Sequence, residues 1–211
     1  MRAESSTTYA PASKTLEIRE ICTTLIGTKI RSGFHLELEM TPLEYEDSFR
    51  DAVEELVNDG RDFQGTVLGL VEERIPFVRQ LELLGIVLDP GIFYGVAYKP
   101  EKKPYAVWLE VFGSGEGPFS GSTNYQEAVE RLPNGLRPAT PFEGINTDFA
   151  SVLNKNFVSL PGGEYKMPGI LTGGLMRFDT LCLDKYLGRP RISHLRLDEL
   201  DYLVGMLAAY E

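Results

Sequence analysis

Three side chains able to bind a metal or move a proton alternate along residues 33–41. His35, Glu37 and Glu39 are interleaved with apolar residues in the sequence Gly33-Phe-His-Leu-Glu-Leu-Glu-Met-Thr41. This alternation is typical of a strand with one buried face and one face in water. Neighbours on one face lie about 7 Å apart, so two of them can share a divalent metal if they lean together. The sequence thus offers a metal site at these three residues, and the alternative is a solvated row paired with Lys or Arg on the next strand.

Other catalytic motifs are absent. The glycine-rich stretch 113–123 matches neither GxxxxGK[ST] nor GxGxxG, and no GxSxG occurs. Only His35 and His194 are available as a base for a Ser or Cys nucleophile. Cys22 and Cys182 lie far apart, which suits a reducing compartment but leaves a long-range disulfide open. We therefore expect a binding protein rather than an enzyme, with a divalent metal as the one cofactor to consider.

Charge is distributed unevenly along the 211 residues, whose net charge is −10. Residues 37–82 hold 13 acidic and 4 basic side chains, whereas residues 155–196 hold 3 acidic and 7 basic. Opposed charged surfaces favour docking on a protein or on a second copy of the chain. The candidate contact residues are Asp47, Asp51, Glu54, Glu55, Arg189, Arg191 and Arg196. The alternative is two solvated surfaces that differ in sign.

Composition also disfavours two classes of partner. The negative charge opposes direct binding to nucleic-acid phosphates and to anionic membranes. No apolar run approaches the roughly 20 residues that span a bilayer, and the N-terminus has no signal-peptide core. We expect a cytoplasmic protein, or a subunit of a virion or other particle assembled in the cytoplasm, that acts by binding protein; an acidic inhibitor is a variant of this hypothesis. The alternatives are a metal-dependent enzyme or metal-binding domain, and a small-ligand domain.

The expected elements predict an α+β fold in which an antiparallel sheet packs against several helices. The capping box Thr41-Pro42-Leu43-Glu44 predicts a helix over 42–58. A second helix is expected over 63–84, interrupted near Pro76 and ended by Gly85. Residues 86–112 predict a meander whose aromatic face, with Trp108, is the place expected for a small ligand.

The rest of the chain is less regular. Residues 1–14 predict a flexible arm, and 15–211 a single domain. Residues 16–30 fit a helix or two strands, with a β-branched run that favours strand at the end. The sequence further predicts a short helix over 124–132, irregular structure over 133–146, strands over 157–160 and 192–197, either element over 175–187, and a helix from Asp198 to Tyr210.

Overall fold

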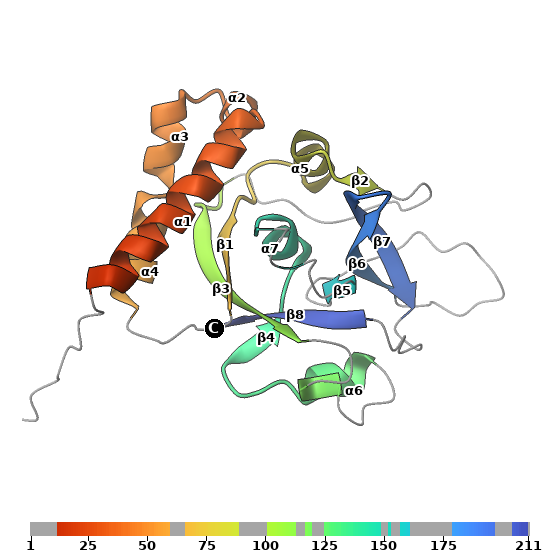
Figure 1. Ribbon diagram of the computed structural model, residues 1–211. Helices are drawn as coiled ribbons and strands as arrows, with labels where there is room; N and C mark the ends of the chain where they lie inside the picture. The colour runs from red at the N-terminus through yellow and green to blue at the C-terminus, as the bar shows by residue number, and fades with distance from the viewer. Residues whose placement is uncertain are drawn as a thin grey trace, which may run out of the picture.

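The computed structural model describes residues 12–59, 66–88, 101–112, 117–119, 125–148, 152, 157–160, 179–196 and 204–210. These residues form helices and a mainly antiparallel sheet, which confirms the predicted α+β class. The strand order is β1-β3-β8-β5-β6-β7-β2, and β4 also pairs with β8 (Figure 1). Two neighbouring pairs, β5 with β8 and β2 with β7, are parallel.

The elements have the following bounds. The helices are α1 (Ala12–Arg31), α2 (Phe34–Glu37), α3 (Pro42–Ser48), α4 (Arg50–Asn58), α5 (Phe77–Leu84), α6 (Tyr125–Glu130) and α7 (Pro141–Ile145), with a 3-10 turn at Gly117–Phe119. The strands are β1 (Val67–Val71), β2 (Val87–Leu88), β3 (Tyr105–Phe112), β4 (Leu136–Pro138), β5 (Phe157–Leu160), β6 (Asp179–Tyr186), β7 (Arg189–Arg196) and β8 (Val204–Tyr210).

Two layers of helices cover the β1–β3 end of the sheet, one on each face. Leu68, Leu70 and Trp108 pack into a core that they share with α1, α2, α3 and α4. Val107 and Leu109 point to the opposite face and join a second core with α5 and α7. Successive strand residues face opposite sides, so this short stretch of sheet contributes to both cores. Helix α7 lies inside the curve of the sheet, whereas α1 crosses its outer side (Figure 1).

Helix α1 forms because its apolar residues recur at helical spacing. Ile18, Cys22 and Ile26, each four residues apart, are all less than 7% exposed. Lys29 continues this stripe and is also buried. The helix ends where Gly33 adopts a left-handed φ of 88° and its N–H donates to the Ile30 carbonyl at 3.0 Å. The strand favoured at the end of 16–30 is therefore wrong, and the predicted arm overlaps the first helical residues; residues 1–11 lie outside the described part of the chain.

The predicted strand over 33–41 is also wrong. After Gly33 the chain forms the short helix α2, in which Phe34 is fully buried and Leu36 is 68% exposed. A strand would place these two side chains on the same face, which their opposite exposures exclude. Phe34 packs with the core side chains of α1, and Glu39 then takes a positive φ of 54° before the next helix. Tertiary packing of Phe34 thus outweighs the local alternation.

The capping box at Thr41 is confirmed in full. The Glu44 N–H donates to the Thr41 hydroxyl at 3.3 Å, and the Thr41 N–H donates to the Glu44 carboxylate at 2.7 Å. The expected helix over 42–58 is divided into α3 and α4 at Phe49, whose side chain is fully buried. The rings of Tyr45 and Phe49 pack edge to face with their centroids 5.4 Å apart, which fixes this junction in the core.

Three further predictions fail where tertiary contacts override local pattern. The first half of the helix predicted over 63–84 is strand β1, and α5 begins only after Pro76; Gly85, with φ 66°, ends it as predicted. The helix predicted to end at Tyr210 is strand β8, held between β3 and β5. Residues 133–146, expected to be irregular, contain β4 and α7. The strands at 157–160 and 192–196 and the helix at 125–130 are confirmed, and 179–186 is a strand.

Of the residues 86–112 predicted to form a meander, Val87–Leu88 and Tyr105–Phe112 are the strands β2 and β3, while residues 89–100 lie outside the described residues. β2 pairs with β7, and β3 pairs with β1 and β8. Whether residues 15–211 form a single domain stays a prediction.

Candidate functional site

A cavity of about 500 Å³ lies between α1 and the end of α7. Helix α1 lines one side of the cavity and the segment after α7 lines the other. Leu84, at the end of α5, also contributes to the lining. The lining is mixed: apolar side chains alternate with hydroxyls, one amine, one amide and two carboxylates. Its members are Glu20, Ile21, Thr24, Leu25, Thr28, Lys29, Ser32, Leu84, Ile145, Asn146, Thr147 and Asp148.

The segment after α7 is fixed against the free edge of β1. The Leu70 N–H donates to the Asn146 carbonyl at 3.1 Å, and Gly69 forms a bridge with Thr147. A Cβ on Gly69 would lie 3.3 Å from Thr147 and 3.2 Å from Val107, so only glycine fits without a shift. This close approach sets the position of Asn146 opposite α1.

Lys29 is the unusual residue of the cavity wall. It is 3% exposed, its amine donates to the Asn146 Oδ1, and its Nζ lies 4.7 Å from the centre of the Phe34 ring. Among the described residues no carboxylate lies within ion-pair distance of this amine. Burial lowers the pKa of Lys29 to about 7, and the charge of Glu72 opposes that shift only in part.

Asn146 is oriented by the groups behind it. Its Nδ2 donates to the Gln80 Oε1 at 2.9 Å and to the Phe142 carbonyl at 2.8 Å, which leaves Oδ1 facing Lys29. Gln80 is fully buried, and its own Nε2 donates to the carbonyls of Glu72 and Ile75. A chain of hydrogen bonds therefore runs from the cavity amine to the backbone that follows β1.

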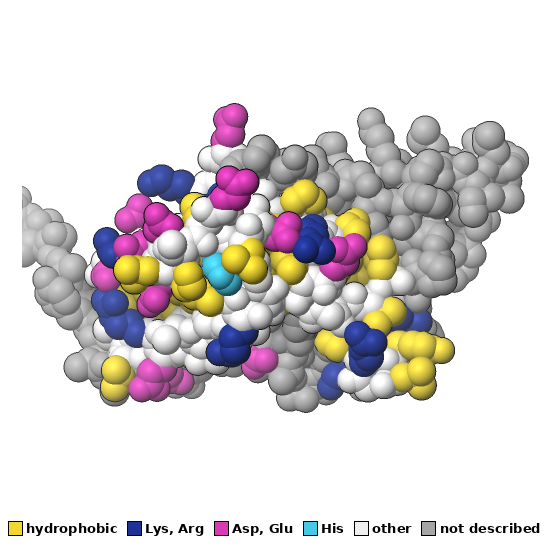
Figure 2. Space-filling model, turned by 90° about the horizontal axis from the view of Figure 1, so that it is seen from above, with side chains coloured by type: hydrophobic (Ala, Val, Ile, Leu, Met, Phe, Trp, Pro, Cys, Tyr) yellow, Lys and Arg dark blue, Asp and Glu magenta, His cyan; other side chains and the backbone are white. Residues whose placement is uncertain are grey.

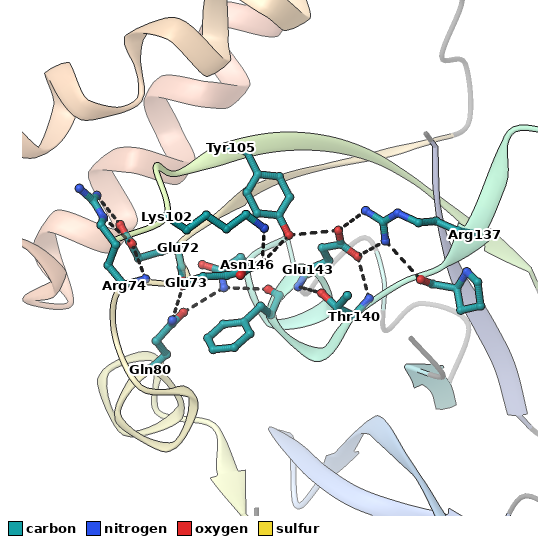
Figure 3. Close-up of polar contacts among 12 residues, drawn as sticks. Glu72, Glu73, Arg74, Gln80, Lys102, Tyr105, Arg137, Thr140, Glu143 and Asn146 are labelled. Carbon is teal, nitrogen blue, oxygen red and sulfur yellow. Dashed lines mark hydrogen bonds and ion pairs between the residues drawn. The ribbon is translucent and has the colours of Figure 1, made fainter. Parts of the chain in front are cut away.

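A second polar cluster lies beside this chain of hydrogen bonds and consists of carboxylates paired with cations (Figure 3). Each of its buried carboxylates has a cation: Glu72 pairs with Arg74 at 2.6 Å, Glu73 with Lys102 at 2.8 Å, and Glu143 with Arg137 at 2.5 Å. The Tyr105 hydroxyl lies 2.8 Å from Glu73 and 3.2 Å from Glu143, linking two of the pairs. Burial, then these two carboxylates, raises the pKa of Tyr105.

Glu143 combines two structural roles. Its carboxylate accepts from the Thr140 N–H at 2.7 Å in a second complete capping box, and it also accepts two hydrogen bonds from Arg137. The lone pairs of this fully buried group are therefore well occupied. The cluster fixes the start of α7, whose far end carries Asn146.

The structure separates the three residues of the predicted metal site. Glu37 accepts from Arg79 at 2.7 Å, and this hydrogen bond lowers the pKa of Glu37. His35 is half-buried in α2, and Glu39 is exposed on the following turn. No group of three or more His, Cys, Asp or Glu side chains with metal-site geometry occurs in the part of the chain that the structure describes. The metal hypothesis stays untested, but the strand on which it relied is absent.

The acidic residues predicted to bind a partner mostly have local cations. Asp47 pairs with Arg50, Asp51 with Lys103, and Glu54 with Arg19, while Glu55 is exposed on α4. Acidic and basic side chains are interspersed over the described part of the face seen from above (Figure 2).

The basic residues are also engaged within the chain. Arg191 makes two hydrogen bonds, at 2.8 and 2.7 Å, to Asp184, which is 1% exposed. Arg189 donates to the Gly85 carbonyl at 3.3 Å. Arg196 belongs to β7, and its side chain lies outside the described set. Protein binding through opposed charges therefore stays a prediction from the sequence.

Both cysteines are free thiols and are buried, so the disulfide that the sequence left open is not formed in the structure. Burial raises the pKa of Cys22 to about 11, which disfavours its thiolate. Trp108, proposed to line a ligand pocket, lies instead in the core beneath α1–α4.

Sequence reasoning missed Lys29, Asn146 and the paired carboxylates. Lys29 had a visible signal, because it continues the Ile18, Cys22, Ile26 stripe once α1 is recognised as a helix. The capping box at Thr140-Pro-Phe-Glu143 has the same form as the one at Thr41. Nothing local marks Asn146, since its partners Lys29 and Gln80 lie 117 and 66 residues away.

The chain was compared with known protein families, curated proteins and solved structures. No family model, no curated protein and no solved structure matches this chain. Within the described residues, no helix is both long and apolar enough to cross a membrane.

Proposed function

We propose that the protein binds a small, polar, non-anionic organic molecule in the cavity between α1 and α7. The observation that carries this proposal is the buried Lys29–Asn146 pair in the cavity wall. Ligand sites typically have volumes of about 300–1,000 Å³, with apolar walls and a few fixed polar groups. The cavity, at about 500 Å³, has these properties.

The charges of the lining support the choice of ligand. Glu20 and Asp148 are exposed members of the lining and carry carboxylates that repel an anion. Lys29 does not reverse this effect, because burial holds its pKa near 7 and leaves about half of the amines neutral. A neutral molecule with carbonyl or hydroxyl groups meets the amine, the Asn146 amide and the threonine hydroxyls without charge repulsion.

Two neighbouring threonines of α1 provide a matched test. Thr24 lines the cavity and Thr23 does not, yet both are exposed and both donate their hydroxyl to the carbonyl four residues earlier. Trp at position 24 should fill the cavity, whereas Trp at position 23 should project into water. Thermal shift and ligand-observed NMR with a library of neutral fragments would be run on wild type, Thr24→Trp and Thr23→Trp.

We expect fragments that raise the melting temperature of the wild type and of Thr23→Trp but not of Thr24→Trp. Fragments that bind all three proteins equally would place binding outside the cavity. A library without any hit on the wild type would contradict the proposal.

A further inference from the structure

We infer that Lys29 forms a reversible imine with an aldehyde or ketone group of the molecule that occupies the cavity. This inference rests on the proposed ligand site and specifies its chemistry. It requires an amine that lines a cavity, is held in one orientation and is free of a carboxylate partner. Lys29 meets each requirement among the described residues.

The Lys29 amine lies on the inner side of α1. Lys29 belongs to the buried stripe of α1 and lines the cavity, and its Nζ donates to the Oδ1 of Asn146, which lines the cavity as well. The charge of Glu72 acts on Lys29 by raising its pKa, but both Glu72 oxygens accept hydrogen bonds from Arg74, at 2.8 Å from Nε and 2.6 Å from Nη2. No described acid therefore anchors the Lys29 ammonium as an ion pair.

The protonation state follows from this environment. An imine forms only from the neutral amine, because the ammonium has no lone pair. With a pKa of about 7 instead of 10.5, Lys29 is neutral in about half of the molecules at pH 7, on the order of 1,000-fold more than an exposed lysine. The lower basicity of the Lys29 amine and the restricted access of reagents to it offset part of the gain from its larger neutral fraction. We therefore expect at least about a tenfold preference for modification at Lys29 over an exposed lysine.

The bond changes balance without an oxidant or reductant. The Nζ lone pair attacks the carbonyl carbon, and a proton moves from nitrogen to the former carbonyl oxygen to give a carbinolamine. The hydroxyl of the carbinolamine then takes the second proton from the nitrogen and leaves as water, and a C=N bond remains. Asn146 acts as a positioning residue: its Oδ1 accepts one N–H of the amine and holds the lone pair in a fixed direction.

The test traps the imine on the full chain. The wild-type protein would be incubated at pH 7 with glycolaldehyde or propanal and sodium cyanoborohydride, which reduces the imine to a stable secondary amine. Peptide mass spectrometry would then give the modified fraction of each lysine. Lys103, with an 86% exposed side chain, is the internal control. We expect Lys29 to be modified at least about ten times as fast as Lys103 at pH 7.

The pH profile and one variant complete the experiment. The trapping rate at Lys29 should reach half its maximum near pH 7. Lys29→Met should lose the fast modification. Equal or slower trapping at Lys29 would overturn the imine, and if fragments still bind, the ligand site stands without it. Absence of both trapping and fragment binding would refute both proposals.

Discussion

Two buried polar regions lie side by side near the start of α5, and they differ in whether their buried charged groups form ion pairs. In the first, Glu72, Glu73 and Glu143 each contact a cation, and every pair bridges separate segments of the chain or fixes a turn. In the second, Lys29 has an amide instead of a carboxylate, and a cavity adjoins it. Buried charges are costly unless paired. The paired region therefore has a structural explanation, whereas the Lys29 amine, which has no ionic partner among the described residues, calls for a functional one.

The largest expected effect comes from removing a cation of the paired region. Arg74→Met leaves Glu72, whose side chain is fully buried, without its ion pair, so we expect the free energy of unfolding to fall by about 3–5 kcal/mol. Lys29→Met removes a charge that has no ionic partner among the described residues, so stability at pH 7 should change by less than about 1 kcal/mol or rise. Urea unfolding followed by circular dichroism measures both. Equal losses in the two variants would remove the contrast between the regions.

The pH dependence of stability sharpens the same contrast. The pKa of Lys29 is lower in the folded protein, about 7, than in the unfolded chain, about 10.5. Between these values the unfolded chain binds more protons, so stability rises with pH across this window and the penalty is greatest below pH 7. From pH 6.5 to 8.5 the rise should be about 2 kcal/mol.

The control for this measurement is Lys29→Met, in which the rise should vanish. Staying below pH 8.5 avoids Cys22, whose raised pKa lowers stability as pH passes from about 9 to about 11. A wild-type curve parallel to that of the variant would mean that the Lys29 amine keeps an ordinary pKa.

The two regions also differ in how far the sequence reveals them. Both capping boxes can be recognised in the amino-acid sequence, and the one at Thr41 correctly predicts a helix start. The ion pairs cannot be predicted from the sequence, because partners such as Glu73 and Lys102 are 29 residues apart and only the fold brings them together. The α+β class follows from the pattern of elements, but β1 and β8 were predicted as helix. Their residues, such as Ala208 and Ala209, are buried between neighbouring strands and show no alternation for a local rule to detect.

A third prediction compares the capping boxes. Thr140→Ala removes the acceptor of a hydrogen bond at the buried start of α7, next to Glu143, and should cost about 2 kcal/mol. Thr41→Ala removes the equivalent bond at the exposed start of α3 and should cost about 1 kcal/mol. Thermal unfolding of both variants measures the difference. A larger loss for Thr41→Ala would show that α7 is held by its packing rather than by its cap.

The smallest effects are expected on the exposed surface of α4, where Asp51 lies 3.4 Å from Lys103 and both side chains are at least 78% exposed. Water and salt screen such a pair, so Asp51→Asn should change stability by less than about 0.5 kcal/mol. Asp184→Asn, at a residue that is 1% exposed and bonded to Arg191 and Ser193, is the buried counterpart and should cost several times more. Chemical unfolding measures both losses, and light scattering of Asp51→Asn at low and high salt tests the predicted protein contact. Self-association that weakens in Asp51→Asn would support a docking role for this face, whereas a stability loss above about 2 kcal/mol would make the Asp51–Lys103 pair a structural one.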